Sequence, residues 1–399
     1  MMNPISIRTA CGIGALTLIC LPLTPAQQQT ATSRIVSAAN TFLATLDQKQ
    51  RQAVLFSFKD EEQRKRWSNL PVVAVPRGGI SLKEMNSAQQ SAAMALVASA
   101  LSPRGFEKVQ QIMEGDEINK TTDQGPPGNR GPRPPFGNAG PRPPLGNGGP
   151  PPQFGNGGPP PPGNGGPPSG RGNNRPPFAN GPIFGKDLYY ISILGEPSEK
   201  DPWMLQFGGH HLALNITIAG EQGVLTPTLT GAQPAIYTID GKTIRPLGQE
   251  SDKAFALLNA LDENQRKQAI LSYRLADLVL GPGQDGKTIQ PEGLKASAMN
   301  DRQRAMLLDV IAEWSGIIHE SAAASRMAEI KAGLNETWFA WSGPTTVTPG
   351  SNITAYYRIQ GPNLVIEYAP QTLGGDPALH VHTMYRDPTN DYGRKFIAK

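Results

Sequence analysis

Two distant parts of this 399-residue chain carry the same spaced pattern of side chains. A Leu-Asp-x-x-Gln-Arg motif stands at 46–51 and again at 261–266, and a Met-Asn-x-x-Gln motif stands at 85–89 and again at 299–303. The first motif recurs after 215 residues and the second after 214. Motifs that recur in the same order at nearly the same spacing are typical of repeated structural units. We therefore predict a tandem duplication, with copy one at about 33–250 and copy two at about 251–399.

Each predicted copy consists of helices followed by an antiparallel hairpin. Apolar residues recur at helical spacing in the segments 33–58, 86–101, 106–113, 254–273 and 301–318. Strand-like runs occupy 188–194, 203–207, 212–218, 337–341, 353–359, 364–368 and 380–385. The predicted fold class is therefore α+β. Two such copies often pair about a pseudo-twofold axis, which would place the related hairpins at 203–214 and 356–366 side by side.

A segment within copy one differs from the rest of the chain in composition. Between 121 and 185 proline, glycine and asparagine dominate, and 20 of the 39 prolines lie here. A repeat of the form Gly-Pro-Arg-Pro-Pro-Phe-Gly-Asn-Ala starts at Gly131, Gly140 and Gly149. Such a sequence cannot form a packed core, so we predict a disordered, partly polyproline-II insertion, either a spacer or a ligand for a partner. The remainder, 27–120 and 186–399, is predicted to be a single domain.

The first 26 residues have the pattern of a signal peptide for export. Arg8 supplies the positive charge, 13–23 form a short apolar core, and Ala26 ends a small-residue cleavage site. Both cysteines of the chain lie in this segment, so the cleaved chain has neither a disulfide nor a cysteine ligand for a metal. We expect an exported protein, periplasmic or extracellular, that contacts a membrane only if the signal stays uncleaved.

Two classes of ligand, nucleic acids and nucleotides, do not fit the sequence. The excess of positive charge lies in the predicted insertion, which holds five arginines and one acidic residue. A structured basic face is therefore not expected, and we predict no nucleic-acid partner. The segment 281–288 has the spacing of a phosphate-binding loop, but Pro291 follows where such a loop needs a helix. No nucleotide cofactor is expected.

Histidines are the strongest candidates for functional chemistry. Four of the five form two close pairs, His210 with His211 and His380 with His382. On a strand, His380 and His382 would project from one face, whereas the adjacent His210 and His211 would point to opposite faces. If the fold brings the pairs together, they can supply the ligands for one divalent transition metal, Zn, Fe, Mn or Cu.

Acidic residues near the second pair are candidates for supporting roles. Asp387 and Asp391 can act as a general base, and they or Glu367 can hold an imidazole through a hydrogen bond. Two other interpretations of the histidines stay open. They can be hydrogen-bonding groups of a pocket without a metal, or satisfied polar groups in a core of strands.

Four motifs resemble those of the bacterial family known as domain of unknown function 3500. They are Gly209-His210-His211-Leu-Ala-Leu-Asn215, Pro227-Thr-Leu-Thr-Gly231-Ala-Gln-Pro234, Gly281-Pro-Gly-Gln-Asp285-Gly286, and the segment from His380 to Gly393. The resemblance covers the chain after the signal, apart from the insertion. It implies the extent of a domain and no reaction, because the family is functionally uncharacterised.

Two functions are compatible with these patterns. The first is an exported metal-dependent enzyme, hydrolytic or oxidative, with histidine ligands. The second is a non-catalytic periplasmic or cell-surface protein that binds a small-molecule or polymer ligand in the same histidine-lined pocket.

Overall fold

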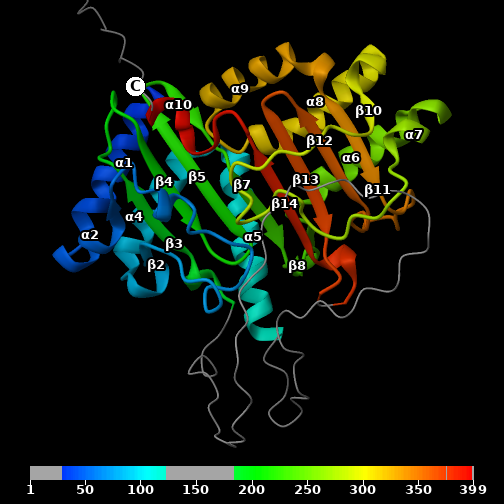
Figure 1. Cartoon of the computed structure of the whole chain (residues 1–399). Coiled ribbons are helices and arrows are strands. Elements are labelled where there is room, and N and C mark those ends of the chain that lie inside the picture. The colour runs from blue at the N-terminus through cyan, green and yellow to red at the C-terminus, as the bar shows by residue number, and fades with distance from the viewer. Residues whose placement is uncertain (1–28, 123–183, 374, 398–399) are drawn as a thin grey trace, which may run out of the picture.

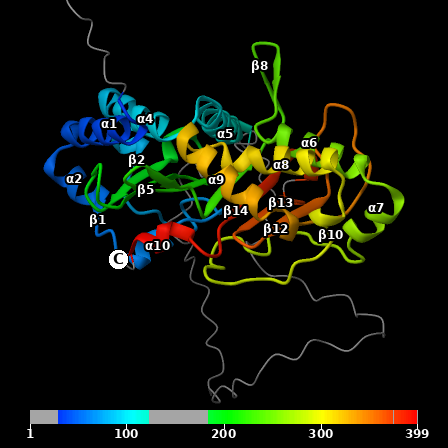
Figure 2. The ribbon, with the colours of Figure 1, turned by 90° about the horizontal axis from the view of Figure 1, so that it is seen from above.

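The computed structural model describes residues 29–122, 184–373 and 375–397. The predicted signal peptide at 1–26 and nearly all of the predicted insertion lie outside these residues. The described chain forms a mixed α+β fold around one twelve-stranded sheet (Figure 1). A second sheet contains two strands, β8 (Tyr237–Ile239) and β9 (Lys242–Ile244), in a hairpin that projects from the body (Figure 2).

The large sheet is antiparallel except where β1 (Leu55–Phe56) pairs with β3 (Tyr190–Leu194). From β1 its order continues through β3, β4 (Trp203–Gly208), β5 (Leu212–Ala219), β7 (Thr228–Ala232), β14 (Val381–Arg386), β13 (Leu364–Pro370), β12 (Tyr356–Gly361), β11 (Trp338–Ser342) and β10 (Leu294–Lys295). Two short strands lie off this path, β2 (Ile80–Ser81) beside β3 and β6 (Gln222–Val224) beside β5.

Helices cover one face of the sheet (Figure 2). They are α1 (Ala31–Thr45), α4 (Ser87–Ala100) and α5 (Pro103–Thr122) over the first half, and α6 (Gly248–Ala260), α8 (Asp301–Ser315) and α9 (Glu320–Ala332) over the second. Shorter helices are α2 (Gln48–Val54), α3 (Glu61–Arg64), α7 (Glu263–Ala269) and α10 (Arg394–Ile397). No helix among the described residues is long and apolar enough to cross a membrane.

Both faces of the sheet are buried, which explains the nearly continuous apolar runs of its strands. On β4, Leu205 belongs to the core beneath the helices, whereas its neighbour Met204 belongs to a smaller cluster that contains Trp67 and Tyr392. Successive side chains of a strand point to opposite faces. A strand covered on both sides therefore loses the apolar–polar alternation of a half-exposed one.

The structure extends or divides several predicted helices. The segment predicted at 106–113 is the middle of the longer α5, and the segment at 254–273 divides into α6 and α7. Helix α9 was not predicted, because its sequence is rich in alanine and lacks a clear apolar stripe.

Equivalent contacts occur in the two halves. Asp47 and Gln50 form a capping box at the start of α2, and Asp262 and Gln265 form one at the start of α7. The Gln50 side chain bonds to that of Gln89, as the Gln265 side chain bonds to that of Gln303; the hydrogen bonds are 2.7 Å long in both halves. The repeated motifs of the sequence thus make the same hydrogen bonds.

Two glycines show how closely these contacts correspond. Gly79 and Gly293 both have positive φ, +86° and +95°. A Cβ atom on either would lie about 2 Å from a strand carbonyl, that of Ile191 or of Phe339. Only glycine permits this backbone approach, so the same constraint acts at the same place in each half.

The halves meet where β7 pairs with β14. Thr230 lies opposite Thr383, and their hydroxyl oxygens are 2.6 Å apart. On either side of this pair, Leu229 is opposite Met384 and Gly231 is opposite His382. Outward from this junction the sheet continues as β5, β4 and β3 on one side and as β13, β12 and β11 on the other. The four paired histidines lie toward one end of this junction.

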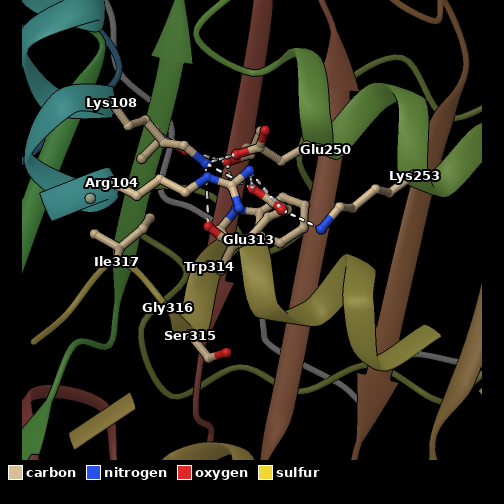
Figure 3. Close-up of polar contacts among 12 residues, drawn as sticks. Arg104, Lys108, Glu250, Lys253, Glu313, Trp314, Ser315, Gly316 and Ile317 are labelled. Carbon is tan, nitrogen blue, oxygen red and sulfur yellow. Dashed lines mark hydrogen bonds and ion pairs between the residues drawn. The ribbon is translucent and has the colours of Figure 1, made fainter. Parts of the chain in front are cut away.

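Helix α5 also joins the halves through a group of charges with a buried centre, which we call the ion-pair cluster: buried Lys108, Glu250 and Glu313 with the more exposed Arg104 and Lys253 (Figure 3). Lys108 bonds to Glu250, which is fully buried. Glu313 accepts from Arg104 and Lys253, each at 2.7 Å. Burial raises the pKa of Glu250, opposed by the charge of Lys108.

Candidate metal centre

The two histidine pairs come together at one end of the β7–β14 junction. His380 immediately precedes β14 and His382 lies within it, and their ring centroids are 4.7 Å apart. His210 and His211 lie in the turn between β4 and β5. This turn reaches β14 because the backbone N–H of Gly231, on the intervening β7, donates to the carbonyl of His211 at 2.7 Å.

Three of these imidazoles converge. One ring nitrogen from each of His211, His380 and His382 lies within 4.8 Å of the others, and such a group can hold a metal ion. The Nε2 atoms of His380 and His382 are 3.1 Å apart. His211 is fully buried, and the other two rings belong to residues that are 5% exposed. The donors thus face one another in an interior that contains little water.

The outer nitrogens of the three rings have partners from other segments. His211 Nδ1 is 2.6 Å from a carboxylate oxygen of Asp116 on α5. His380 Nδ1 is 2.7 Å from the carbonyl oxygen of Leu373. Both oxygens only accept, so Nδ1 carries a proton in each of these two rings and Nε2 is the atom left to face the other imidazoles. His382 Nδ1 lies 3.2 Å from the amide nitrogen of Asn69.

Asp116 is itself held in place. Its second carboxylate oxygen accepts a hydrogen bond from the hydroxyl of Tyr189 at 2.7 Å. Asp116 is 1% exposed and Tyr189 is fully buried. A buried carboxylate with these two donors fixes both the orientation and the tautomer of His211.

Two of the three converging histidines, His380 and His382, are in the protonation state that metal binding requires. Burial, followed by the neighbouring His211, lowers the pKa of His380 to about 4. Burial and the adjacent imidazoles hold the pKa values of His210 and His382 well below 6.5. These rings are therefore neutral near pH 7, and neutral imidazole is the form that ligates a metal.

One inward-facing nitrogen has no partner. His211 Nε2 is buried and makes no hydrogen bond to any described residue. Gly231 leaves the space that the rings occupy, because a Cβ atom there would lie 3.0 Å from Cδ2 of His382 and 3.2 Å from Cδ2 of His211. Glycine at this position thus permits the close approach of the two imidazoles.

His210 is arranged differently from its neighbour. Its ring lies against His211, with centroids 3.8 Å apart, and against Phe184 at 4.8 Å. The expectation that His210 and His211 point to opposite faces is wrong, because they belong to a turn and not to a strand. With Asp116 and His211, His210 forms a second group that can hold a metal. His211 belongs to both groups. In the second group its hydrogen-bond partner Asp116 would itself be a ligand.

The structure separates the acidic candidates from the histidines. Asp387 follows β14 at the end opposite His380, and its carboxylate pairs with Arg326 at 3.0 Å. Asp391 pairs with Arg386 at 3.0 Å and accepts from the backbone of Asp387. Their contacts among the described residues are those of structural ion pairs, and neither bonds to an imidazole.

Glu367 and Asp285 also have other partners. Glu367 accepts from two backbone N–H groups of the 279–280 segment and from Tyr356. Asp285, in the glycine-rich segment 281–288, accepts from Arg386 and Tyr392. That segment contains turns and no helix, as Pro291 predicts.

Sequence reasoning missed the two residues that hold the outer nitrogens through side chains. Asn69 lies in a loop with no local signal. Asp116 did have a local signal. It lies four residues after Ile112 and eight after Lys108, so all three are on the same, buried side of α5. A charged residue on an apolar helix face is the sign of a buried polar partner.

A family model described as protein of unknown function (DUF3500) matches residues 28–394. The chain belongs to this family. The match spans all the histidines and Asp116, so the candidate metal centre lies inside the DUF3500 region. Neither the curated proteins nor the solved structures contain a significant match to this chain.

Proposed function

We propose that this DUF3500 protein binds one divalent transition metal through Nε2 of His211, His380 and His382. The observation that carries the proposal is the convergence of three buried imidazoles on a point where His211 Nε2 has no partner. Leaving a buried polar atom unsatisfied costs about 1–3 kcal/mol. A ligand that accepts the lone pair would remove this cost.

The separations between the nitrogens suit an ion after small movements. Metal–nitrogen bonds of about 2.0–2.1 Å in tetrahedral geometry place the donors roughly 3.4 Å apart. The His380–His382 pair is at 3.1 Å, and the whole set is within 4.8 Å. Small shifts of the His211 ring and the Asp116 carboxylate together, with their hydrogen bond kept, would supply the difference. His382 would also need its proton on Nδ1, which a turn of the Asn69 amide allows.

Three protein ligands leave a coordination position open, which is typical of catalytic sites rather than of structural ones. An ion bound there would polarise a substrate or lower the pKa of a water molecule, and Fe or Cu would add redox chemistry. We therefore propose an enzyme, hydrolytic or oxidative. Asp116 would hold His211, and the carbonyl of Leu373 would hold His380. The all-imidazole donor set favours Zn, Cu or Fe over Mn.

Elemental analysis of the untagged protein tests this proposal. The protein is purified without chelator beside the double variant His380→Ala/His382→Ala. We expect about one transition metal per chain in the native protein and none in the variant, with circular dichroism and thermal unfolding showing a folded chain. The same stoichiometry in both proteins, or no metal after supplementation with Zn, Fe, Mn and Cu, would contradict the proposal.

A second function is supported by one contact. His382 Nε2 can donate to His380 Nε2 at 3.1 Å, so these two rings satisfy each other without a metal. In that case His211 Nε2 would accept from an organic ligand in a non-catalytic binding protein. This alternative predicts no bound metal and a ligand-dependent rise in melting temperature.

The organisation of the chain is also proposed. We propose that residues 1–26 direct export, which N-terminal sequencing of the mature protein at Gln27 would support. We propose that the halves arose by tandem duplication, supported by the paired capping boxes, the paired glycines and the matching strand order on either side of the β7–β14 junction. The segment 121–185 would then be an insertion within copy one.

A further inference from the structure

A second candidate site lies at the other end of the β7–β14 junction. A cavity of about 470 Å³ opens between α9, β6, the end of β14 and the C-terminal segment. Figure 1 shows α9 and α10 above this end of the sheet. The volume is in the range of small-molecule sites, about 300–1,000 Å³. None of the four clustered histidines lines the cavity, so it is independent of the proposed metal.

The charges of the cavity wall are largely neutralised within the wall. Arg326 pairs with Asp387 at 3.0 Å and with Glu329 at 2.9 Å. Two further charges of opposite sign, Glu221 and Lys395, belong to exposed residues at the rim. Inside the cavity, a charged ligand would have to compete with these ion pairs, which costs free energy, and the rim offers one charge of each sign instead of an excess of either. The wall therefore disfavours ions.

One buried polar group has hydrogen-bonding capacity left. The hydroxyl oxygen of Tyr385 accepts from Arg326 Nε at 3.1 Å. Its own proton has no acceptor among the contacts of the described residues. Tyr385 is 1% exposed and lines the cavity. A ligand oxygen would satisfy this donor.

The rest of the wall combines apolar and polar surface. Apolar side chains come from Leu225, Ile318, Ala322 and Phe396, whereas Ser325 and Asn390 add polar groups. This combination suits a molecule that has hydroxyl groups along its edges and C–H groups on its faces. An apolar wall with a few placed hydrogen-bonding groups is the usual form of such a site.

From this lining we infer that the cavity binds a neutral polyhydroxylated molecule of mono- or disaccharide size. The Tyr385 hydroxyl donates to a ligand oxygen. Exposed carboxylates and the Lys395 ammonium accept from and donate to further hydroxyl groups. The apolar residues contact the faces of the sugar ring. Binding requires no metal.

Isothermal titration calorimetry of the mature protein tests this inference. The probes are glucose, galactose, maltose and cellobiose, with glucuronate as an anionic and glucosamine as a cationic analogue. We expect saturable one-to-one binding of at least one neutral sugar, and weaker binding of both charged analogues. No binding of any neutral sugar, or tighter binding of a charged analogue, would overturn the inference.

Two variants locate the binding. Ser325 is exposed on α9 and its hydroxyl bonds back to the Ser321 carbonyl, so Ser325→Trp narrows the cavity without disturbing the core. Ser91 on α4 is exposed and bonds back to Ser87 in the same way, which makes Ser91→Trp the matched control. We expect Ser325→Trp to weaken sugar binding about ten-fold or more and Ser91→Trp to leave it unchanged. Equal affinities in the two variants would place the sugar elsewhere.

Tyr385→Phe tests the hydroxyl itself. Loss of one hydrogen bond to the ligand lowers affinity by roughly five- to ten-fold. Tyr237→Phe is the control, because that hydroxyl is also engaged, donating to the Gln111 carbonyl, but lies near β8. An unchanged affinity in Tyr385→Phe, measured on a folded variant, would contradict the assigned role of Tyr385.

Discussion

Helix α5 contributes to two buried polar groups, and they differ in how their atoms are satisfied. Two turns apart, Lys108 enters the ion-pair cluster and Asp116 supports the histidines. Among the described residues, the first group contains one buried atom without a partner, Glu250 Oε2, and the second contains two, His210 Nδ1 and, among the proposed metal ligands, His211 Nε2. An unpaired atom alone therefore does not identify a functional site.

The surroundings of Glu250 Oε2 and of His211 Nε2 distinguish the two groups. Beside Glu250 stands the ammonium of Lys108, a positive charge that repels a cation. Beside His211 stand two further imidazoles with lowered pKa values. The ion-pair cluster balances its charges internally, whereas the histidines direct ring nitrogens from three segments to one point. Convergence of donors is what indicates the metal centre.

The largest effect on stability should come from breaking the ion-pair cluster. Lys108→Met removes the main counter-charge of Glu250, and an uncompensated buried charge costs about 3–5 kcal/mol in the free energy of unfolding. Urea unfolding measures this cost. Lys253→Met is the matched control with a smaller effect, because Lys253 is more exposed and Glu313 keeps Arg104. Metal content should stay the same in both variants. Loss of the metal in Lys108→Met would contradict the independence of the ion-pair cluster and the metal centre.

Acid should affect the metal-free protein through the histidines. The pKa of His380 is about 4 when folded and 6.5 as a free group. Its neutral form therefore contributes stability above pH 6.5 that is lost as the pH falls toward 4, by up to about 3 kcal/mol. Burial raises the pKa of Glu250, so its effect on stability has the opposite sign. The contribution of Glu250 to the free energy of unfolding is lost as the pH rises.

Urea unfolding of chelator-treated protein between pH 4 and 7 measures the balance of these two contributions. We expect stability to fall on acidification, and to fall less in His380→Asn. Glu250→Gln should make the fall steeper. A variant His380→Asn that follows the native curve throughout would contradict the assigned protonation state of His380.

Asp116→Asn should weaken metal binding by about 10–100-fold, the usual effect of removing a carboxylate that supports a histidine ligand. The amide keeps an acceptor for His211 but loses the negative charge. Competition with a chelating dye measures the affinity. Glu117→Gln is the control on the same helix, since Glu117 bonds to Lys120 and Lys186 instead. Equal metal affinities in the two variants would contradict the supporting role of Asp116.

Gly231→Ala should have the smallest effect, a few-fold loss of metal affinity and a loss of stability of about 1–3 kcal/mol from overpacking. The new methyl group would press on His211 and His382. Gly115→Ala on α5 is the control, because its Cβ would make only ordinary contacts, the nearest at 3.5 Å. Native affinity in Gly231→Ala would mean that the rings have more room than the structure gives them.

Much of the local structure could be predicted from the sequence. The helices and hairpins follow periodicity within short windows, and the repeated Asp-x-x-Gln motifs make capping boxes that depend only on local geometry. The repeat suggested that the two histidine pairs meet, but the expected reason is wrong: the related hairpins do not lie side by side, because β7 and β14 stand between them. Long-range partners could not be predicted. Asn69 meets His382 across more than three hundred residues, and no local pattern encodes that contact.

The roles of Asp387 and Asp391 illustrate the same limit. In sequence they follow His382 closely. Along an extended strand, about 3.3 Å per residue separates them from the imidazoles, and the arginines that pair with Asp387 and Asp391 come from α9 and from β14. Asp116 is far from the histidines in sequence but lies on α5, where its carboxylate reaches His211. Sequence proximity therefore favoured the wrong carboxylates as imidazole partners.

Crystals of the protein grown with the metal that elemental analysis identifies would test the central claim most directly. Anomalous diffraction at the absorption edge of that metal locates the ion. We expect one strong peak at about 2.0–2.1 Å from Nε2 of His211, His380 and His382. No peak at this point in fully supplemented crystals, or a peak held by other residues, would contradict the account.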